Sequence, residues 1–307
     1  MVRRSRSTIV TVVAGAIVAG VAIGCGIRLA RSSHTTTPEG PAPVPTPTAP
    51  PPRAVQSPPK PPASPGCGTA AHETRNISYT TRSGRTFHVW LPSPYDATRA
   101  YPTVLAFHGW YTNGRAFQSW FKMEEHDPGA FTVYPDSQGA MWELAGDRDL
   151  DFVADIVEAM SNAYCIDRAH VIALGFSYGG KFVHHLGCKR PALVRAISVG
   201  DGSWAQETGC APMPVLVTHR TRDHDELLEW GKDAAQRWAK IGGCTATAEP
   251  SELAHGCVTY RGCTAPATVT FCEDTHFDPT WPKEWNHTIR EEFRSLTWTW
   301  FESVSEL

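Results

Sequence analysis

The sequence predicts an α/β domain in which a mostly parallel, doubly wound sheet is flanked by helices. Short apolar segments alternate with amphipathic ones through residues 67–307, as they do in chains of βαβ units. That stretch is also long enough to form one large core. Its clearest junction between a strand and a helix encloses the pattern G-x-S-x-G at residues 175–179, which is typical of a sharp functional turn.

The spacing of apolar residues places the main elements. Apolar, β-branched runs predict strands, of which the most distinct are Thr103–Phe107, His170–Leu174, Pro214–His219 and Ala267–Cys272. Apolar residues at helical spacing predict helices at Arg115–Glu125, Leu150–Tyr164, Tyr178–Cys188, Leu227–Lys240 and His287–Val304. We interpret the apolar stripes of these helices as core positions.

Ser177 is the candidate nucleophile. The strand before it and the helix after it give the order of a nucleophile elbow. Gly175 and Gly179 suit such a turn, because a side chain at either position would collide with the neighbouring strand or helix. A serine hydroxyl needs a base to become nucleophilic, and in this arrangement an acid and then a histidine follow along the chain. A chance match of the five-residue pattern is the alternative.

The orienting acid is expected after the strand Pro214–His219. Asp223 lies in the loop that follows it, with Asp225 and Glu226 as competitors. Both competitors fit the first turn of the next helix, where acidic side chains are favourable for structural reasons alone. We therefore predict that Asp223 is the acid.

The base is expected after the last predicted strand. His276 lies in the loop after Cys272, and the helix that begins at about His287 closes the chain. In the predicted mechanism His276 takes the proton of Ser177, and Asp223 stabilises the imidazolium.

The oxyanion hole is expected to consist of two backbone N–H groups. One belongs to Tyr178, the residue after the nucleophile, and the other to the loop after the strand Thr103–Phe107. Trp110 is the predicted second donor, and Tyr111 is the alternative.

At these positions the chain resembles secreted feruloyl esterases and related carbohydrate esterases, a group that includes acetyl xylan esterases and polyhydroxybutyrate depolymerases. The resemblance extends over about residues 67–305 and rests on the segments 107–110, 175–180, 219–223 and 272–276. It implies an α/β-hydrolase fold, hydrolysis of carboxylic esters and the triad Ser177, Asp223 and His276. Two positions depart from the family: Arg220 stands where glycine is usual, and Asp274-Thr275 stand where Gly-Gly often precedes the histidine.

Eight cysteines lie within residues 67–307. An even number in an exported domain predicts four disulfides. A zinc site is disfavoured, because the chain has no C-x-x-C pair and no Cys/His cluster of zinc-ligand spacing. Guided by the resemblance, we expect the pairs Cys67–Cys165, Cys188–Cys210, Cys244–Cys272 and Cys257–Cys263.

The sequence predicts three parts along the chain: a signal peptide or signal anchor at 1–33, a proline-rich disordered linker at 34–66, and the esterase domain at 67–307. Three arginines precede the apolar segment 8–27, which is long enough to cross a bilayer as a transmembrane helix. Cleavage, lipidation at Cys25 and retention as an anchor remain open. Thirteen of the 25 prolines lie within residues 38–66, as in an extended spacer or, alternatively, a recognition site for another protein.

Charge and motifs exclude several kinds of partner. Seven of the 28 basic and one of the 31 acidic residues lie in the first 66 positions, which leaves a net charge of −9 for the rest. Such a surface does not suit nucleic acid. No Walker loop, dinucleotide fingerprint or metal motif is present in the sequence, so we expect no cofactor and no metal. We expect a monomer that contacts a membrane only through its N-terminal segment.

The aromatic residues indicate a substrate class. Flat rings stack on sugars and on phenolic groups, and we predict substrate contacts for Trp110, Tyr111, Tyr178, Trp204 and Trp281; packing in the core is the alternative. The leading hypothesis is a secreted or surface-anchored serine esterase that removes feruloyl or acetyl groups from polysaccharide. The alternatives are a polyhydroxyalkanoate depolymerase, an acyl transferase acting on cell-envelope glycolipids, and a catalytically inactive, surface-tethered binding module, which the unusual Arg220 and Asp274 motivate.

Overall fold

The computed structural model describes residues 64–70, 75–126, 129–204, 207–254, 256–276 and 286–305, all within one unit at Pro58–Leu307. Its strands are β1 (Asn76–Thr80), β2 (Thr86–Trp90), β3 (Tyr101–Phe107), β4 (Phe131–Pro135), β5 (Ile166–Phe176), β6 (Ala196–Gly200), β7 (Pro214–Arg220), β8 (Ala248–Pro250), β9 (Cys257–Tyr260) and β10 (Thr268–Asp274). Its α-helices are α1 (Gly114–Phe121), α2 (Arg148–Ala163), α3 (Tyr178–Lys189), α4 (Leu228–Ile241) and α5 (Glu291–Ser305), and a short 3-10 helix, η1, spans Met123–Glu125.

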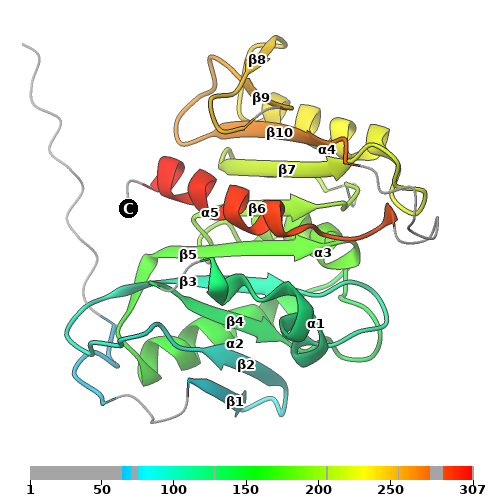
Figure 1. Ribbon diagram of the computed structural model, residues 1–307. Coiled ribbons are helices and arrows are strands. Elements are labelled where there is room, and N and C mark those ends of the chain that lie inside the picture. The colour runs from blue at the N-terminus through cyan, green and yellow to red at the C-terminus, as the bar shows by residue number, and fades with distance from the viewer. Residues whose placement is uncertain are drawn as a thin grey trace, which may run out of the picture. The chain divides into compact units, whose positions relative to one another are not determined.

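The described strands form one ten-stranded sheet in the order β1-β2-β4-β3-β5-β6-β7-β10-β9-β8 (Figure 1). The six strands from β4 to β10 in this order run parallel to one another. Both edges are antiparallel, at β1, β2 and β4 on one side and at β10, β9 and β8 on the other. The predicted fold class, a mostly parallel sheet flanked by helices, is confirmed.

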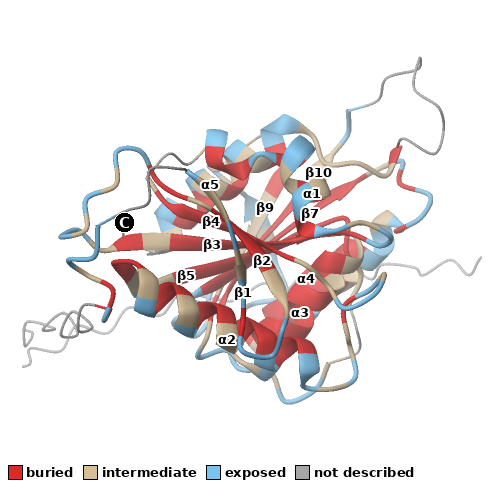
Figure 2. Cartoon of the chain, turned by 90° about the horizontal axis from the view of Figure 1, so that it is seen from below, coloured by how far each residue is buried: buried red, intermediate tan, exposed pale blue. Residues whose placement is uncertain are grey.

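Helices cover both faces of the sheet and bury a core against each (Figures 1 and 2). The larger core lies under α2, α3 and α4 and includes Phe152, Phe182 and Trp238. The smaller one lies under α1 and α5 and includes Phe117 and Trp300. Because helices shield both faces, the central strands are mostly buried, as expected for parallel sheets; the start of β5 at 167–170 is the less buried part of that strand. The apolar helical stripes are therefore core positions, as the sequence indicates.

Two helix boundaries differ from the prediction. The helix predicted at Arg115–Glu125 ends at Phe121, because Lys122 adopts a left-handed conformation with φ of 45° and the chain continues as η1. The last helix begins at Glu291 and not at about His287. His287 therefore lies in the segment before the helix, a difference that matters for the site.

The structure has four disulfides. Cys67–Cys165 and Cys188–Cys210 are the pairs that the resemblance implied. The other two expectations are wrong, because the structure pairs Cys244 with Cys263 and Cys257 with Cys272. The reason for the second pair is register: Cys257 of β9 lies directly opposite Cys272 of β10. The first pair closes the β8–β9 region, where the N–H of Thr245 donates to the carbonyl of Arg261 at 2.7 Å.

The expectation of a transmembrane segment is corrected. Within the described ranges, none of the helices is long and apolar enough to cross a bilayer. The segment 8–27, Cys25 and the predicted linker up to residue 63 lie outside the described residues.

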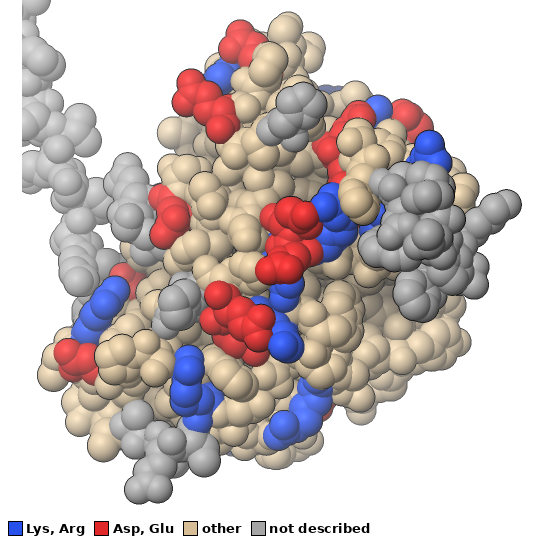
Figure 3. Space-filling model, viewed as in Figure 1, with Lys and Arg blue, Asp and Glu red and all other residues tan. Residues whose placement is uncertain are grey.

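Charged side chains are mixed on the face that Figure 3 shows. Acidic and basic groups lie next to each other over the region of α5 and around it. Several form ion pairs, among them Arg290 with Asp274 and with Glu292. No broad field of one sign covers the described part of this view.

Candidate active site

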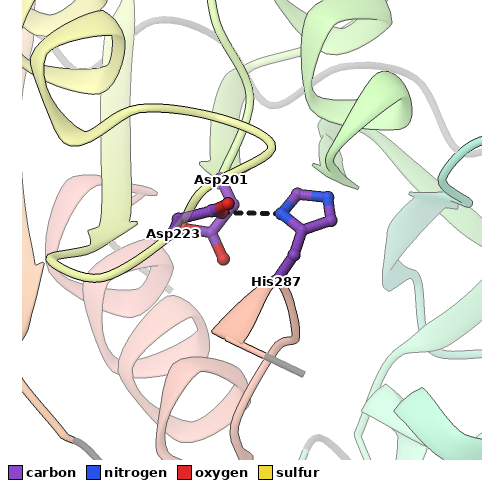
Figure 4. A group of neighbouring side chains, drawn as sticks. All are labelled: Asp201, Asp223 and His287. Carbon is purple, nitrogen blue, oxygen red and sulfur yellow. Dashed lines mark hydrogen bonds and ion pairs between the residues drawn. The ribbon is translucent and has the colours of Figure 1, made fainter. Parts of the chain in front are cut away.

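Three side chains that are distant in the sequence meet at the carboxyl edge of the sheet. Ser177 lies between β5 and α3, Asp223 lies after β7, and His287 lies before α5. Nε2 of His287 is 2.7 Å from Oγ of Ser177, and Nδ1 of the same ring is 2.6 Å from Oδ2 of Asp223. Figure 4 shows the imidazole directed at the Asp223 carboxylate. The hydroxyl, the imidazole and the carboxylate thus form a continuous row of hydrogen-bonded groups.

The backbone around Ser177 is strained and crowded. Ser177 has φ of 54° and ψ of −121°, a conformation that a residue other than glycine seldom adopts. Its N–H donates to the carbonyl of Gly200 at 2.9 Å. A Cβ atom on Gly175 would lie 2.3 Å from the carbonyl oxygen of Gly179, and one on Gly179 would lie 2.2 Å from that of Phe107. These contacts explain why both flanking positions are glycine.

Asp223 is held by its own loop. Its side chain is fully buried, and Oδ1 accepts hydrogen bonds from the backbone N–H groups of Asp225 and Glu226, each at 2.9 Å. Oδ2 is thereby directed at His287. The competitors differ in environment, since Asp225 is exposed and Glu226 pairs with Lys181. Asp223 is thus the acid at the imidazole.

The prediction that His276 lies beside Ser177 is wrong. His276 is exposed, and its backbone N–H donates to Oδ1 of Asp274 at 2.9 Å. The imidazole at Ser177 comes from His287, which arrives just before α5 and not directly after β10. The sequence carried one signal that favours His287: a second histidine precedes the last helix, and the interval between β10 and that helix is longer than a short turn.

Arg220 holds both ends of the interval that carries His287. Its buried guanidinium donates to the carbonyl of His276 at 3.2 Å and to the carbonyl of Thr288 at 3.3 Å. A second contact joins the same two regions, because Arg290 pairs with Asp274 at 3.0 Å. Arg220 and Asp274 are two of the positions that depart from the family pattern. In this structure both serve to fix the segment that carries the imidazole.

The environment raises the pKa of His287. Burial alone would lower this pKa, but the hydrogen bond and the charge of Asp223, with the charge of Asp225, outweigh burial. The ring of Phe176 stacks on the imidazole with centroids 4.8 Å apart. His287 is therefore a stronger base than a free histidine while it stays hydrogen-bonded to Ser177.

Hydrogen bonds hold the backbone in the region of the predicted oxyanion hole. A Cβ on Gly109 would lie 3.4 Å from Cβ of Ser177, so the turn that leads to Trp110 passes close to the nucleophile. The turn is fixed through His108, whose carbonyl accepts from the indole of Trp142 at 2.9 Å. The alternative donor, the N–H of Tyr111, bonds to the carbonyl of Ala140 at 3.1 Å. That contact leaves Trp110 and Tyr178 as the proposed donors.

The predicted substrate contacts have different environments. Trp110 and Tyr111 are exposed and stacked, with ring centroids 4.6 Å apart, and Tyr178 lies 6.3 Å from Trp110. Trp204 is half-buried and packs edge to face on Trp238, which supports the alternative of a packing role; its predicted substrate contact stays a prediction. Trp281 lies outside the described residues, as does Trp285.

The pH dependence follows from His287. The base acts only when it is neutral, so activity is expected to fall as the pH drops through the pKa of His287. Because this pKa is raised, the midpoint of the acidic limb of kcat/KM is expected above the ordinary histidine value of about 6.5. Rates on a chromogenic ester from pH 5 to 9 measure it. Asp225→Asn should move the midpoint down, and a wild-type midpoint clearly below 6.5 would contradict the assignment.

This fold is that of an α/β-hydrolase, and Ser177 lies at the turn between β5 and α3. No family model matches the chain. It is 28% identical over 227 residues to feruloyl esterase C of Emericella nidulans, covering 69% of this chain and 83% of the relative. It is 29% identical over 204 residues to feruloyl esterase D of Neurospora crassa, covering 59% and 69%.

A solved structure agrees in fold. The acetyl xylan esterase from Aspergillus awamori superposes with a TM-score of 0.56 at 14% identity, over 74% of this chain and 100% of that one. The chain is thus similar to feruloyl esterases and related carbohydrate esterases, and the resemblance stated from its motifs is confirmed.

Proposed function

We propose that the protein is a serine carboxylic-ester hydrolase that removes feruloyl or acetyl groups from polysaccharide. The observation that carries this proposal is the hydrogen-bonded row of Ser177, His287 and Asp223. The similarity to feruloyl esterases supports the substrate class. The intact row favours an enzyme over the inactive binding module, because a chain that only binds ligands has no need of an aligned hydroxyl, imidazole and carboxylate.

The geometry supports acyl transfer in two steps. His287 Nε2 takes the proton of Ser177 Oγ as the hydroxyl attacks the ester carbonyl, and Asp223 stabilises the imidazolium. The backbone N–H groups of Trp110 and Tyr178 are proposed to bind the oxyanion. His287 then protonates the leaving alcohol, and water hydrolyses the acyl-enzyme by the same route. Ser177 is only partly buried, so a substrate can reach its hydroxyl.

The stacked pair of Trp110 and Tyr111 is the proposed substrate-binding surface. Their exposed fractions are 52% and 77%, high values for rings packed against each other. A third flat ring, from a phenolic acyl group or a sugar, can stack on the exposed side of such a pair. Trp110 also borders Tyr178, which places the surface next to the proposed oxyanion donors.

The four disulfides support export of the domain. Disulfides persist in oxidising compartments and are rare in the cytosol of most cells. We propose that the enzyme acts outside the cytoplasm.

A fluorophosphonate probe tests the reaction class and the nucleophile together. The probe is expected to modify Ser177 in the native protein, because phosphonylation needs an activated serine. Mass spectrometry of the labelled peptide locates the modification, and Ser177→Ala is the control. Hydrolysis of feruloyl, acetyl and aliphatic polyester substrates by the same preparation then separates the substrate classes. Labelling at another residue, or ester turnover that survives Ser177→Ala, would refute the proposal.

A further inference from the structure

A second buried carboxyl group lies beside the proposed triad. Asp201 directly follows β6 and is only 3% exposed. One oxygen of Asp201, one oxygen of Asp223 and one nitrogen of His287 all lie within 4.8 Å of one another. Figure 4 shows the two carboxyl groups next to each other, with the imidazole facing them. The sequence motifs pointed to Asp223 alone, and the reaction described above makes no use of Asp201.

The backbone holds Asp201 in a costly position. Its φ is 46°, in the left-handed region that non-glycine residues seldom adopt. Its N–H donates to the carbonyl of Thr218 at 3.0 Å, and its Oδ1 accepts the backbone N–H of Arg220 at 2.8 Å. Strain of this kind persists only where surrounding contacts enforce it, and it is concentrated at functional sites.

Two buried carboxyl groups this close repel each other when both are ionised, so the ionisation of both is unfavourable in free energy. Asp223 has the better anion partners, namely two backbone N–H groups and His287. The groups that face Asp201 are Asp223, His287 and Arg220. Burial and the charge of Asp223 raise the pKa of Asp201 to about 8, although Arg220 and His287 act in the opposite direction. Asp201 is therefore the partner that keeps its proton at neutral pH.

We propose that Asp201 is a reserve acid of the triad: a positioning residue that stays protonated while Asp223 is ionised and that ionises to support His287 when Asp223 is lost. The inference rests on the proposed function. Removal of the Asp223 charge leaves burial as the main cause that raises the pKa of Asp201, while Arg220 and His287 still lower it. In the proposal this change is enough for the proton to leave to solvent, and a carboxylate again lies beside the imidazole. The two acids are then partly interchangeable, whereas Ser177 and His287 are not.

A double-mutant cycle measures this exchange. The variants are Asp223→Ala, Asp201→Asn and the double variant, and the readout is the rate at which a fluorophosphonate modifies Ser177. Alanine is chosen at 223 because an amide there would present an NH₂ group to Nδ1 and force the wrong tautomer. Asparagine is chosen at 201 because it tolerates left-handed backbone and its amide oxygen can still accept the N–H of Arg220.

We expect Asp201→Asn to slow labelling at least about tenfold more in the Asp223→Ala background than in the otherwise native protein, because coupled residues are not additive. Asp225→Asn is the matched control: it removes a nearby but exposed carboxylate, and its effect should be the same in both backgrounds. Circular dichroism melts verify folding. If Asp223→Ala unfolds, Asp223→Ser replaces it, since a hydroxyl can still accept the backbone N–H of Asp225 or Glu226 that Asp223 accepts.

The pH dependence separates this role from a merely structural one. The acidic limb of labelling should lie at higher pH in Asp223→Ala than in the double variant, since only the former retains a carboxylate that favours the imidazolium. Equal effects of Asp201→Asn in both backgrounds, or Asp223→Ala labelling as slowly as His287→Ala, would overturn the proposal. Labelling does not require a carboxylic-ester substrate. If the protein hydrolyses esters but gives either of these labelling results, only the proposal of a reserve acid is refuted. A native protein that fails to label at Ser177 sinks the proposed function and the reserve acid together.

Discussion

His287→Ala is expected to lower kcat/KM for ester hydrolysis by at least about 10⁴-fold, because it removes the imidazole that contacts Ser177 Oγ and that we propose takes its proton. His276→Ala should leave kcat/KM within about threefold. The side chain of His276 is exposed, and the contacts described above involve its backbone N–H and carbonyl, which alanine retains.

Initial rates on a short-chain chromogenic ester measure both effects, with the thermal midpoint as a folding check. A second check is the fluorophosphonate label, which should be lost in His287→Ala and kept in His276→Ala. The opposite pattern would restore His276 as the base and would mean that the contact between His287 and Ser177 does not operate in solution.

Gly179→Ala is expected to destabilise the fold by more than about 3 kcal/mol and to abolish labelling of Ser177. The added Cβ would lie 2.2 Å from the carbonyl oxygen of Phe107 and 2.5 Å from that of His108. Both are backbone atoms of β3 and the loop after it, so neither can turn aside as a side chain would. Helix α3 must shift away from the sheet, and the elbow at its start shifts with it.

Gly187→Ala on the same helix is the matched control. Its Cβ would meet side-chain atoms, Sδ of Met213 at 3.0 Å and two methyl groups of Ile197 at 3.1 Å. These atoms can adjust, overpacking of this kind costs about 1–3 kcal/mol, and the higher helix propensity of alanine returns about 1 kcal/mol. Denaturant titration should place the free energy of unfolding of Gly187→Ala near that of the native protein. A comparable loss in both variants would show that helix packing in general, and not the elbow, is sensitive.

Much of the site could be predicted because each expectation rested on local chemistry. The elbow requires glycine on both sides of Ser177, and the structure shows the backbone contacts that impose this requirement. Asp223 is preferred in the sequence because Asp225 and Glu226 are expected in the first turn of the next helix. That reason is wrong, because α4 begins at Leu228, although Asp223 is the acid that contacts the imidazole. The core helices followed from apolar periodicity, which survives in any helix that packs on a sheet.

The base could not be predicted in the same way, because its position depends on a long interval of chain. Two histidines follow β10, and local pattern favours the nearer one, His276. The choice is decided by tertiary contacts, in which Arg220 fixes both ends of the interval and places His287 at the acid. The predicted pairing of two disulfides is wrong for a related reason. The register of β9 against β10 sets Cys257 opposite Cys272, and cysteine spacing in the sequence does not indicate this register.

The disulfide between Cys67 and Cys165 determines where the domain can best be fused or immobilised. Cys165 precedes β5, whereas Ser177 follows the opposite end of that strand. Ser64 reinforces the junction by accepting the N–H of Ile166 at 2.9 Å. A force applied to the chain before Cys67 is thus transmitted through the disulfide to the start of β5. That end of β5 is the one farther from Ser177. Immobilisation or fusion through the N-terminus should leave the reactive rim unobstructed and mechanically undisturbed.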